Sequence, residues 1–109
     1  MIISFANQDI EDLCKQVKLA IKKLGRESAK KLQRRISECY AANTVIELVA
    51  GRPHPLEYDR LGQYALDLHK GYRLIFGSTK VPFPVKADGS IDWAKVADIT
   101  MIEIEDYHD

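Results

Sequence analysis

The chain has 109 residues, of which 46% are hydrophobic and 29% are charged, as expected of one domain with a modest core. Sixteen basic and sixteen acidic residues cancel, which excludes a general electrostatic attraction to nucleic acid or anionic membranes and leaves only local patches. No apolar run approaches the roughly 20 residues of a membrane span, and no basic segment followed by an apolar one opens the chain. We therefore expect a single cytoplasmic domain over residues 1–109 that does not bind membranes.

The first half of the chain has the pattern of helices after a short apolar run. The run MIISFA is a candidate strand, and Asn7 or Asp9 offers the N-cap of an amphipathic helix that ends near Gly25. A second helix is predicted from about Glu27, with apolar residues along one stripe. Two helices that meet at a glycine indicate an antiparallel hairpin.

Both cysteines and many basic residues fall in this helical region. Cys14 and Cys39 occupy apolar positions of the pattern without CxxC or other ligand spacing, so we expect buried, reduced thiols. The basic residues suit either contact with a phosphate backbone or a solvated helix face. They are Lys22, Lys23, Arg26, Lys30, Lys31, Arg34 and Arg35.

Alternation of polar and apolar residues predicts a β-hairpin formed by QYALDL and YRLIF. Only one loop length puts both apolar sets on the same face of the hairpin. A three-residue loop at 69–71, with its glycine in the left-handed conformation, pairs Leu66 with Leu74 and sets Asp67 opposite Arg73. In this register an ion pair between Asp67 and Arg73 would partly neutralise the arginine.

The segment after the hairpin is predicted to be a surface excursion. Its prolines and an Asp-Gly pair favour loops and turns, and the residues from Asp92 onward favour one short helical turn. Because the segment is longer than an ordinary connection, we expect Phe83 or Trp93 to pin it to the domain.

The chain ends in IEIEDYHD, which has the alternation of a strand. We expect Ile102 and Ile104 to face the core, whereas the intervening acidic residues and Tyr107 face the other way. Tyr107 would then share the polar face of the sheet with Arg73, which makes that face a candidate site.

Two N-terminal helices followed by HPLEYDRLGQYALDLHKGYRLIF, DGSIDWAKV and IEIEDYH resemble the RelE/ParE superfamily of type II toxin–antitoxin toxins, closest to its HigB-like branch. The resemblance covers most of the chain from about residue 50 onward and, in helix order only, the first half. It implies a small α+β fold with an N-terminal helical hairpin on a twisted antiparallel β-sheet. Many members are endoribonucleases that cut messenger RNA in the ribosomal A site, and others poison DNA gyrase.

Metal-free RNA cleavage needs a group that takes the 2′-hydroxyl proton, a cation for the phosphorane charge and a proton donor for the leaving oxygen. The resemblance implies that Arg73 holds the phosphate, that His108 acts as acid or base, and that Tyr107 positions or stacks a base. His54 matches a histidine that some HigB-like members use. No metal or other cofactor is implied, since the histidines have no zinc-ligand spacing.

The sequence also departs from the pattern of HigB-like nucleases. Pro55 and Glu57 stand where lysines are common, and Asp67 stands where a second strand arginine is common. Arg60 and Lys70 remain as candidate substrate contacts. The lost positive charge keeps two alternatives open: a toxin that acts on a protein such as gyrase, and a catalytically decayed antitoxin-binding module.

The partners that the resemblance implies follow from the toxin role. They are a cognate antitoxin, expected to be of helix-turn-helix type, and the ribosome with its messenger RNA. DNA would be contacted only indirectly, through the antitoxin.

Overall fold

The computed structural model describes residues 1–107, which form three α-helices and five β-strands. The helices are α1 (Gln8–Lys15), α2 (Val17–Leu24) and α3 (Arg26–Ala41). The strands are β1 (Ile2–Phe5), β2 (His54–Pro55), β3 (Gln63–Asp67), β4 (Tyr72–Ser78) and β5 (Asp98–Asp106). Three short 3₁₀ turns are η1 (Val45–Glu47), η2 (Tyr58–Arg60) and η3 (Trp93–Lys95). No helix among the described residues is long and apolar enough to cross a membrane.

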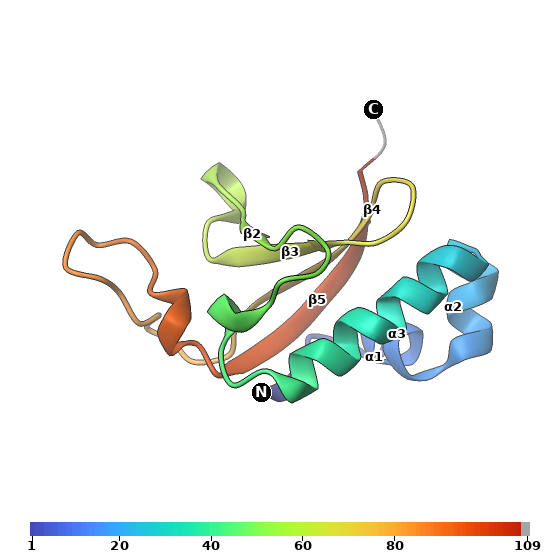
Figure 1. The fold of residues 1–109 in the computed structure, drawn as a ribbon, viewed down its shortest axis with the longest axis horizontal. Coiled ribbons are helices and arrows are strands. Elements are labelled where there is room, and N and C mark those ends of the chain that lie inside the picture. Colours follow the sequence, from blue (N-terminus) through green and yellow to red (C-terminus); the bar gives the residue numbers. More distant parts are fainter. Residues whose placement is uncertain (108–109) are drawn as a thin grey trace.

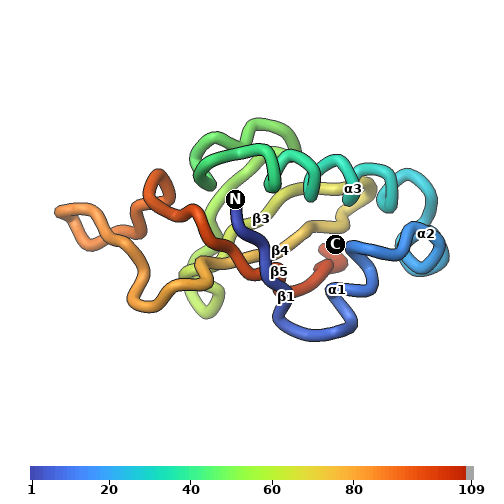
Figure 2. The backbone as a smooth tube through the Cα atoms, turned by 90° about the horizontal axis from the view of Figure 1, so that it is seen from below, coloured from blue at the N-terminus to red at the C-terminus, as the bar shows by residue number. Residues whose placement is uncertain are grey.

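The strands form one mixed sheet in the order β1-β5-β4-β3-β2, and the helices lie along it, with α2 near the turn between β3 and β4 (Figure 1). The predicted α+β class is confirmed. The expected antiparallel pairing holds for β2 to β5, whereas β1 runs parallel to β5 and makes the sheet mixed (Figure 2). A parallel pair needs a long connection, and here nearly the whole chain separates the two strands. Alternation in sequence carries no information about strand direction.

The first predicted helix is two helices in the structure. Asn7 caps α1 as expected, since its Oδ1 accepts a hydrogen bond from the backbone N–H of Ile10 at 3.1 Å. The chain then leaves helical geometry at Gln16, with φ −111° and ψ 102°, and α2 ends at Gly25. The break allows α1 to bury Ile10 and α2 to bury Ala20 as separate elements, so tertiary packing overrides the helical periodicity of the sequence.

The predicted hairpin register is confirmed. Leu66 lies opposite Leu74, and Asp67 lies opposite Arg73. The loop spans residues 69–71, in which Gly71 has φ 84° and Lys70 also has a positive φ, 49°. The side-chain period of two and a glycine-containing loop were sufficient to fix this pairing.

A bulge in β5 alters the predicted facing of one isoleucine. The register shifts between Ile75 and Phe76, so that Phe76 pairs with Met101 and Ile75 with Glu103. Ile104 packs against the core as expected. Ile102 is displaced by the bulge, and a Cβ built at Gly77, on the opposite face, would lie 3.7 Å from its Cδ1. The bulge leaves Ile102 without a partner on β4.

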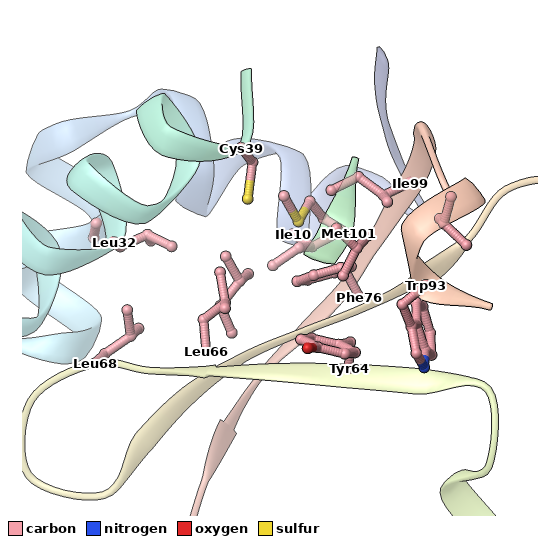
Figure 3. Packing of buried hydrophobic residues seen from close by; sticks show 14 of the residues in the cluster. Ile10, Leu32, Cys39, Tyr64, Leu66, Leu68, Phe76, Trp93, Ile99 and Met101 are labelled. Atoms are coloured by element: carbon pink, nitrogen blue, oxygen red, sulfur yellow. The ribbon is translucent and has the colours of Figure 1, made fainter. Parts of the chain in front are cut away.

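Phe83 and Trp93 both anchor the long segment between β4 and β5 to the rest of the domain. The Trp93 ring is 8% exposed and meets the Tyr64 ring edge-on, with centroids 4.8 Å apart (Figure 3). The Phe83 ring lies against Gly62, where an added Cβ would come within 2.8 Å of it. The excursion therefore belongs to the same packed unit as the sheet.

The cysteines are free thiols within the helical layer. Cys39 is fully buried in the core and Cys14 is half-buried, so the expectation of buried thiols holds fully for Cys39 and in part for Cys14 (Figure 3). Burial raises the pKa of the Cys14 thiol to about 12 and that of the Cys39 thiol to about 12. Both groups are therefore protonated near neutral pH.

Candidate functional site

Arg73 is the centre of the polar face of the sheet. It alternates with the core residues of β4 and so faces away from the helices, yet it is only 8% exposed. Its Nε and Nη2 both donate hydrogen bonds to Oε2 of Glu105, at 3.0 and 2.5 Å. A charge this well covered must be paired, and Glu105 on the neighbouring strand provides the pairing.

Tyr107 covers Arg73 from the end of β5. The guanidinium carbon of Arg73 lies 3.9 Å from the centroid of the Tyr107 ring. The backbone N–H of Tyr107 donates to the carbonyl of Gly71 at 2.7 Å, which ties the strand end to the hairpin turn. The tyrosine itself remains 56% exposed. The ring therefore has a fixed position and exposed surface for a stacking partner.

His54 reaches the same arginine from β2. Its Nε2 lies 3.4 Å from Nη1 of Arg73, and its Nδ1 lies 2.7 Å from the carbonyl oxygen of Arg52. These partners favour the tautomer in which Nδ1 carries the proton and donates to that carbonyl. Nε2 is then the acceptor that faces Arg73, and it is the ring atom available for proton transfer at the site.

The other arginines of this face also have carboxylate partners. Nη2 of Arg60 lies 2.5 Å from Oε1 of Glu103 and 3.8 Å from Oε1 of Glu105. Nε of Arg52 lies 2.8 Å from Oδ2 of Asp67, a hydrogen bond that raises the pKa of the Arg52 guanidinium. Fixed positive and negative charges thus alternate across the face.

The expected ion pair between Asp67 and Arg73 is wrong although their register is right. Asp67 binds Arg52, whereas Arg73 binds Glu105. Strand β5 lies on the other side of β4 from β3, and the Glu105 carboxylate on it accepts from both Nε and Nη2 of the arginine. The conclusion that a carboxylate neutralises Arg73 stands, with a different residue supplying it.

A small cleft of about 140 Å³ opens beside this cluster. It lies between the hairpin turn and the end of β5, so a ligand in this cleft would contact both Arg73 and Tyr107. Its lining residues are Arg52, Asp67, Leu68, Gly71, Tyr72, Arg73 and Tyr107.

The structure thus brings together Arg73, Tyr107 and His54, and it connects Arg60 to them through a shared carboxylate. Lys70 is exposed on the hairpin turn. His108 lies outside the described residues.

Sequence reasoning placed Glu103 and Glu105 on the face of Tyr107 but gave them no role. Each is the nearest carboxylate partner of a site arginine, Glu103 of Arg60 and Glu105 of Arg73. Their alternation with the isoleucines was the available signal. Which strand lies beside Arg73 was not visible from the sequence.

Comparison with known proteins supports the fold. No protein-family model matches the chain, and no curated protein matches it. A solved structure titled YoeB/ParE toxin from Agrobacterium tumefaciens is similar over 100% of both chains, with a TM-score of 0.60 and 12% identity. The YoeB dimer from Staphylococcus aureus is similar over 100% of this chain and 98% of that one, with a TM-score of 0.56 and 17% identity. The chain therefore has the fold of these two toxins.

Proposed function

We propose that this chain is the toxin of a type II toxin–antitoxin system and that it cleaves messenger RNA on the ribosome without a metal ion. The observation that carries the proposal is the cluster of Arg73, Tyr107 and His54, in which the imidazole and the tyrosine ring both contact the guanidinium. The shared fold with YoeB/ParE toxins supports the toxin role. The HigB-like branch stays a prediction from sequence.

The residues have suitable chemistry for cleavage by the neighbouring 2′-hydroxyl. Arg73 would stabilise the charge that develops on the phosphorane, and the exposed surface of Tyr107 would stack on an adjacent base. Nε2 of His54 can accept a proton, and we propose His108 as the second acid or base. One of these two histidines would take the proton of the 2′-hydroxyl, and the other, in its protonated form, would donate a proton to the leaving 5′-oxygen.

Substrate phosphate must compete with Glu105 for Arg73. Because Nε and Nη2 of the arginine are both engaged, bidentate phosphate binding through these two nitrogens requires Glu105 to release them. Arg60, 3.8 Å from the other oxygen of Glu105, is placed to receive the released carboxylate. Exchange of partners between two arginines would limit the electrostatic cost of opening the site.

The same neutralisation favours one second candidate, a toxin that acts on a protein such as DNA gyrase. Arginines that already hold carboxylates are weak phosphate ligands, so the polar face could serve as a protein-binding surface. In that case, RNA would remain intact while growth stops.

Regulated expression with mapping of RNA 5′ ends tests the proposal. We expect growth arrest with new ends in translated messages, and loss of both effects in Tyr107→Ala. Growth arrest without new RNA ends would favour a toxin that acts on a protein target. Absence of growth arrest would favour a catalytically decayed module that only binds the antitoxin. Co-expression with the product of an adjacent reading frame tests the proposed antitoxin, which should bind the chain and restore growth.

A further inference from the structure

The charges of this chain cancel in total but are separated along the fold. Residues 17–35, which form α2 and the first part of α3, hold eight of the sixteen basic residues and one of the sixteen acidic residues. This segment has a net charge of +7, and the rest of the chain has −7. A local positive potential of this kind is invisible in the total charge.

The basic side chains stand in rows on the exposed surface of two neighbouring helices. Arg26, Lys30 and Arg34 recur every fourth residue of α3, and Lys18 and Lys22 have the same spacing on α2. Helices α2 and α3 pack side by side (Figure 1). Four residues advance an α-helix by about 6 Å, so each row is a regular line of cations.

These cations differ from the arginines of the candidate site. We define the basic surface by the exposed residues Lys18, Lys22, Lys23, Arg26, Lys30 and Arg34. Within residues 1–107, none of the six makes an ion pair, whereas the site arginines all do. Like charges four residues apart destabilise a helix, and no ion pair in the described chain offsets that cost here.

The basic surface is attached to the same end of the molecule as the candidate site. The Ser28 hydroxyl, near the start of α3, donates a hydrogen bond to the carbonyl of His69 at 3.0 Å. This contact joins α3 to the β3–β4 turn, which carries exposed Lys70 and, through Gly71, holds the backbone of Tyr107. A nucleic acid at Tyr107 could therefore extend over the turn to the helices.

We propose that the basic surface binds the phosphate backbone of structured RNA and anchors the chain beside its substrate. An RNA backbone fits better than an acidic protein, because the exposed residues of α2 and of α3 from 26 to 37 are all polar except Val17 at the start of α2. Protein interfaces have an apolar core, whereas interfaces with nucleic acid are polar and positively charged. The inference extends the proposed function, but the binding itself does not require cleavage.

The test measures binding of a fluorescently labelled short RNA duplex by anisotropy at several salt concentrations. The variant Lys22→Gln/Lys30→Gln removes two cations from the basic surface. The control Lys86→Gln/Lys95→Gln removes two exposed lysines from the excursion and changes net charge equally. Loss of two phosphate contacts should lower the steepness of log K against log salt by about 2. The ratio of wild-type to variant affinity should therefore fall about tenfold between ~50 and ~200 mM salt.

The outcomes separate the inference from the proposed function. Equal effects of variant and control, at unchanged melting temperature, would overturn the inference, since net charge alone would then explain binding. Binding of a poly-glutamate peptide without binding of the duplex would also overturn it and assign the surface to an acidic protein. Duplex binding that depends on the basic surface supports it even if the wild type fails to cleave RNA, and Tyr107→Ala should retain such binding.

Discussion

The guanidinium carbon of Arg73 lies 3.9 Å from the centre of the Tyr107 ring, so strand β4 and the last described residue form one unit. Tyr107 is fixed by its backbone bond to Gly71, and the arginine by its two hydrogen bonds to Glu105. A ring side chain near the chain end is thereby explained. It covers a charge that would otherwise be open to water on that side.

Replacing the ring tests this relationship directly. In Tyr107→Ala the stacking is lost, and we expect a loss of about 0.5–2 kcal/mol in the free energy of unfolding together with loss of growth arrest. Tyr107→Phe keeps the ring and should stay close to the wild type in stability. Urea unfolding of both variants measures the effect, and equal stability of all three proteins would refute a stabilising role for the contact.

Removing the charge of Glu105 should separate stability from anion binding. In Glu105→Gln we expect tighter binding of short single-stranded RNA, because Arg73 is no longer neutralised, and a stability loss of about 1–3 kcal/mol, because a nearly buried cation loses its partner. Asp67→Asn is the matched control, since its partner Arg52 is exposed, and it should cost at most about 1 kcal/mol. Stronger RNA binding by Asp67→Asn than by Glu105→Gln would contradict this account.

The proposed acid and base should differ from structural histidines in their effect on rate. His108→Ala and His54→Ala should each lower cleavage about 10²–10⁴-fold, the usual contribution of one general acid or base. His69→Ala is a suitable control, because the described contact of His69 to Ser28 uses its backbone carbonyl. Single-turnover cleavage, measured beside thermal melting, checks the ranking. If His69→Ala proved as damaging as the other two, the assignment of roles would fail.

The buried thiols predict a decline of stability at alkaline pH. Desolvation raises the pKa of Cys14 and of Cys39 from 9.0 to about 12 in the folded chain. Between pH 9 and 12 the unfolded chain therefore binds fewer protons than the folded one, and stability falls as pH rises. The variant Cys14→Ala/Cys39→Ala should lose less stability over this range, as measured by urea unfolding at stepwise pH. Parallel curves for the two proteins would disprove the contribution.

The hairpin shows how far the sequence alone could go. Its register, including Asp67 opposite Arg73, followed from a side-chain period of two and a loop of fixed length. The cap at Asn7 and the helix boundary at Gly25 were local in the same sense. For each of them, the residues that decide the geometry are neighbours in the chain.

The tertiary structure alone decided which carboxylate holds Arg73, where the first helix breaks and how β1 runs. Glu105 stands beside Arg73 because β5 occupies the far edge of β4, a choice between strands that are distant in sequence. The bulge at Ile102 and the break at Gln16 likewise arise where packing overrides a periodic pattern. Periodicity reports which face of an element is apolar, whereas the partner of that face is set by burial summed over the whole chain.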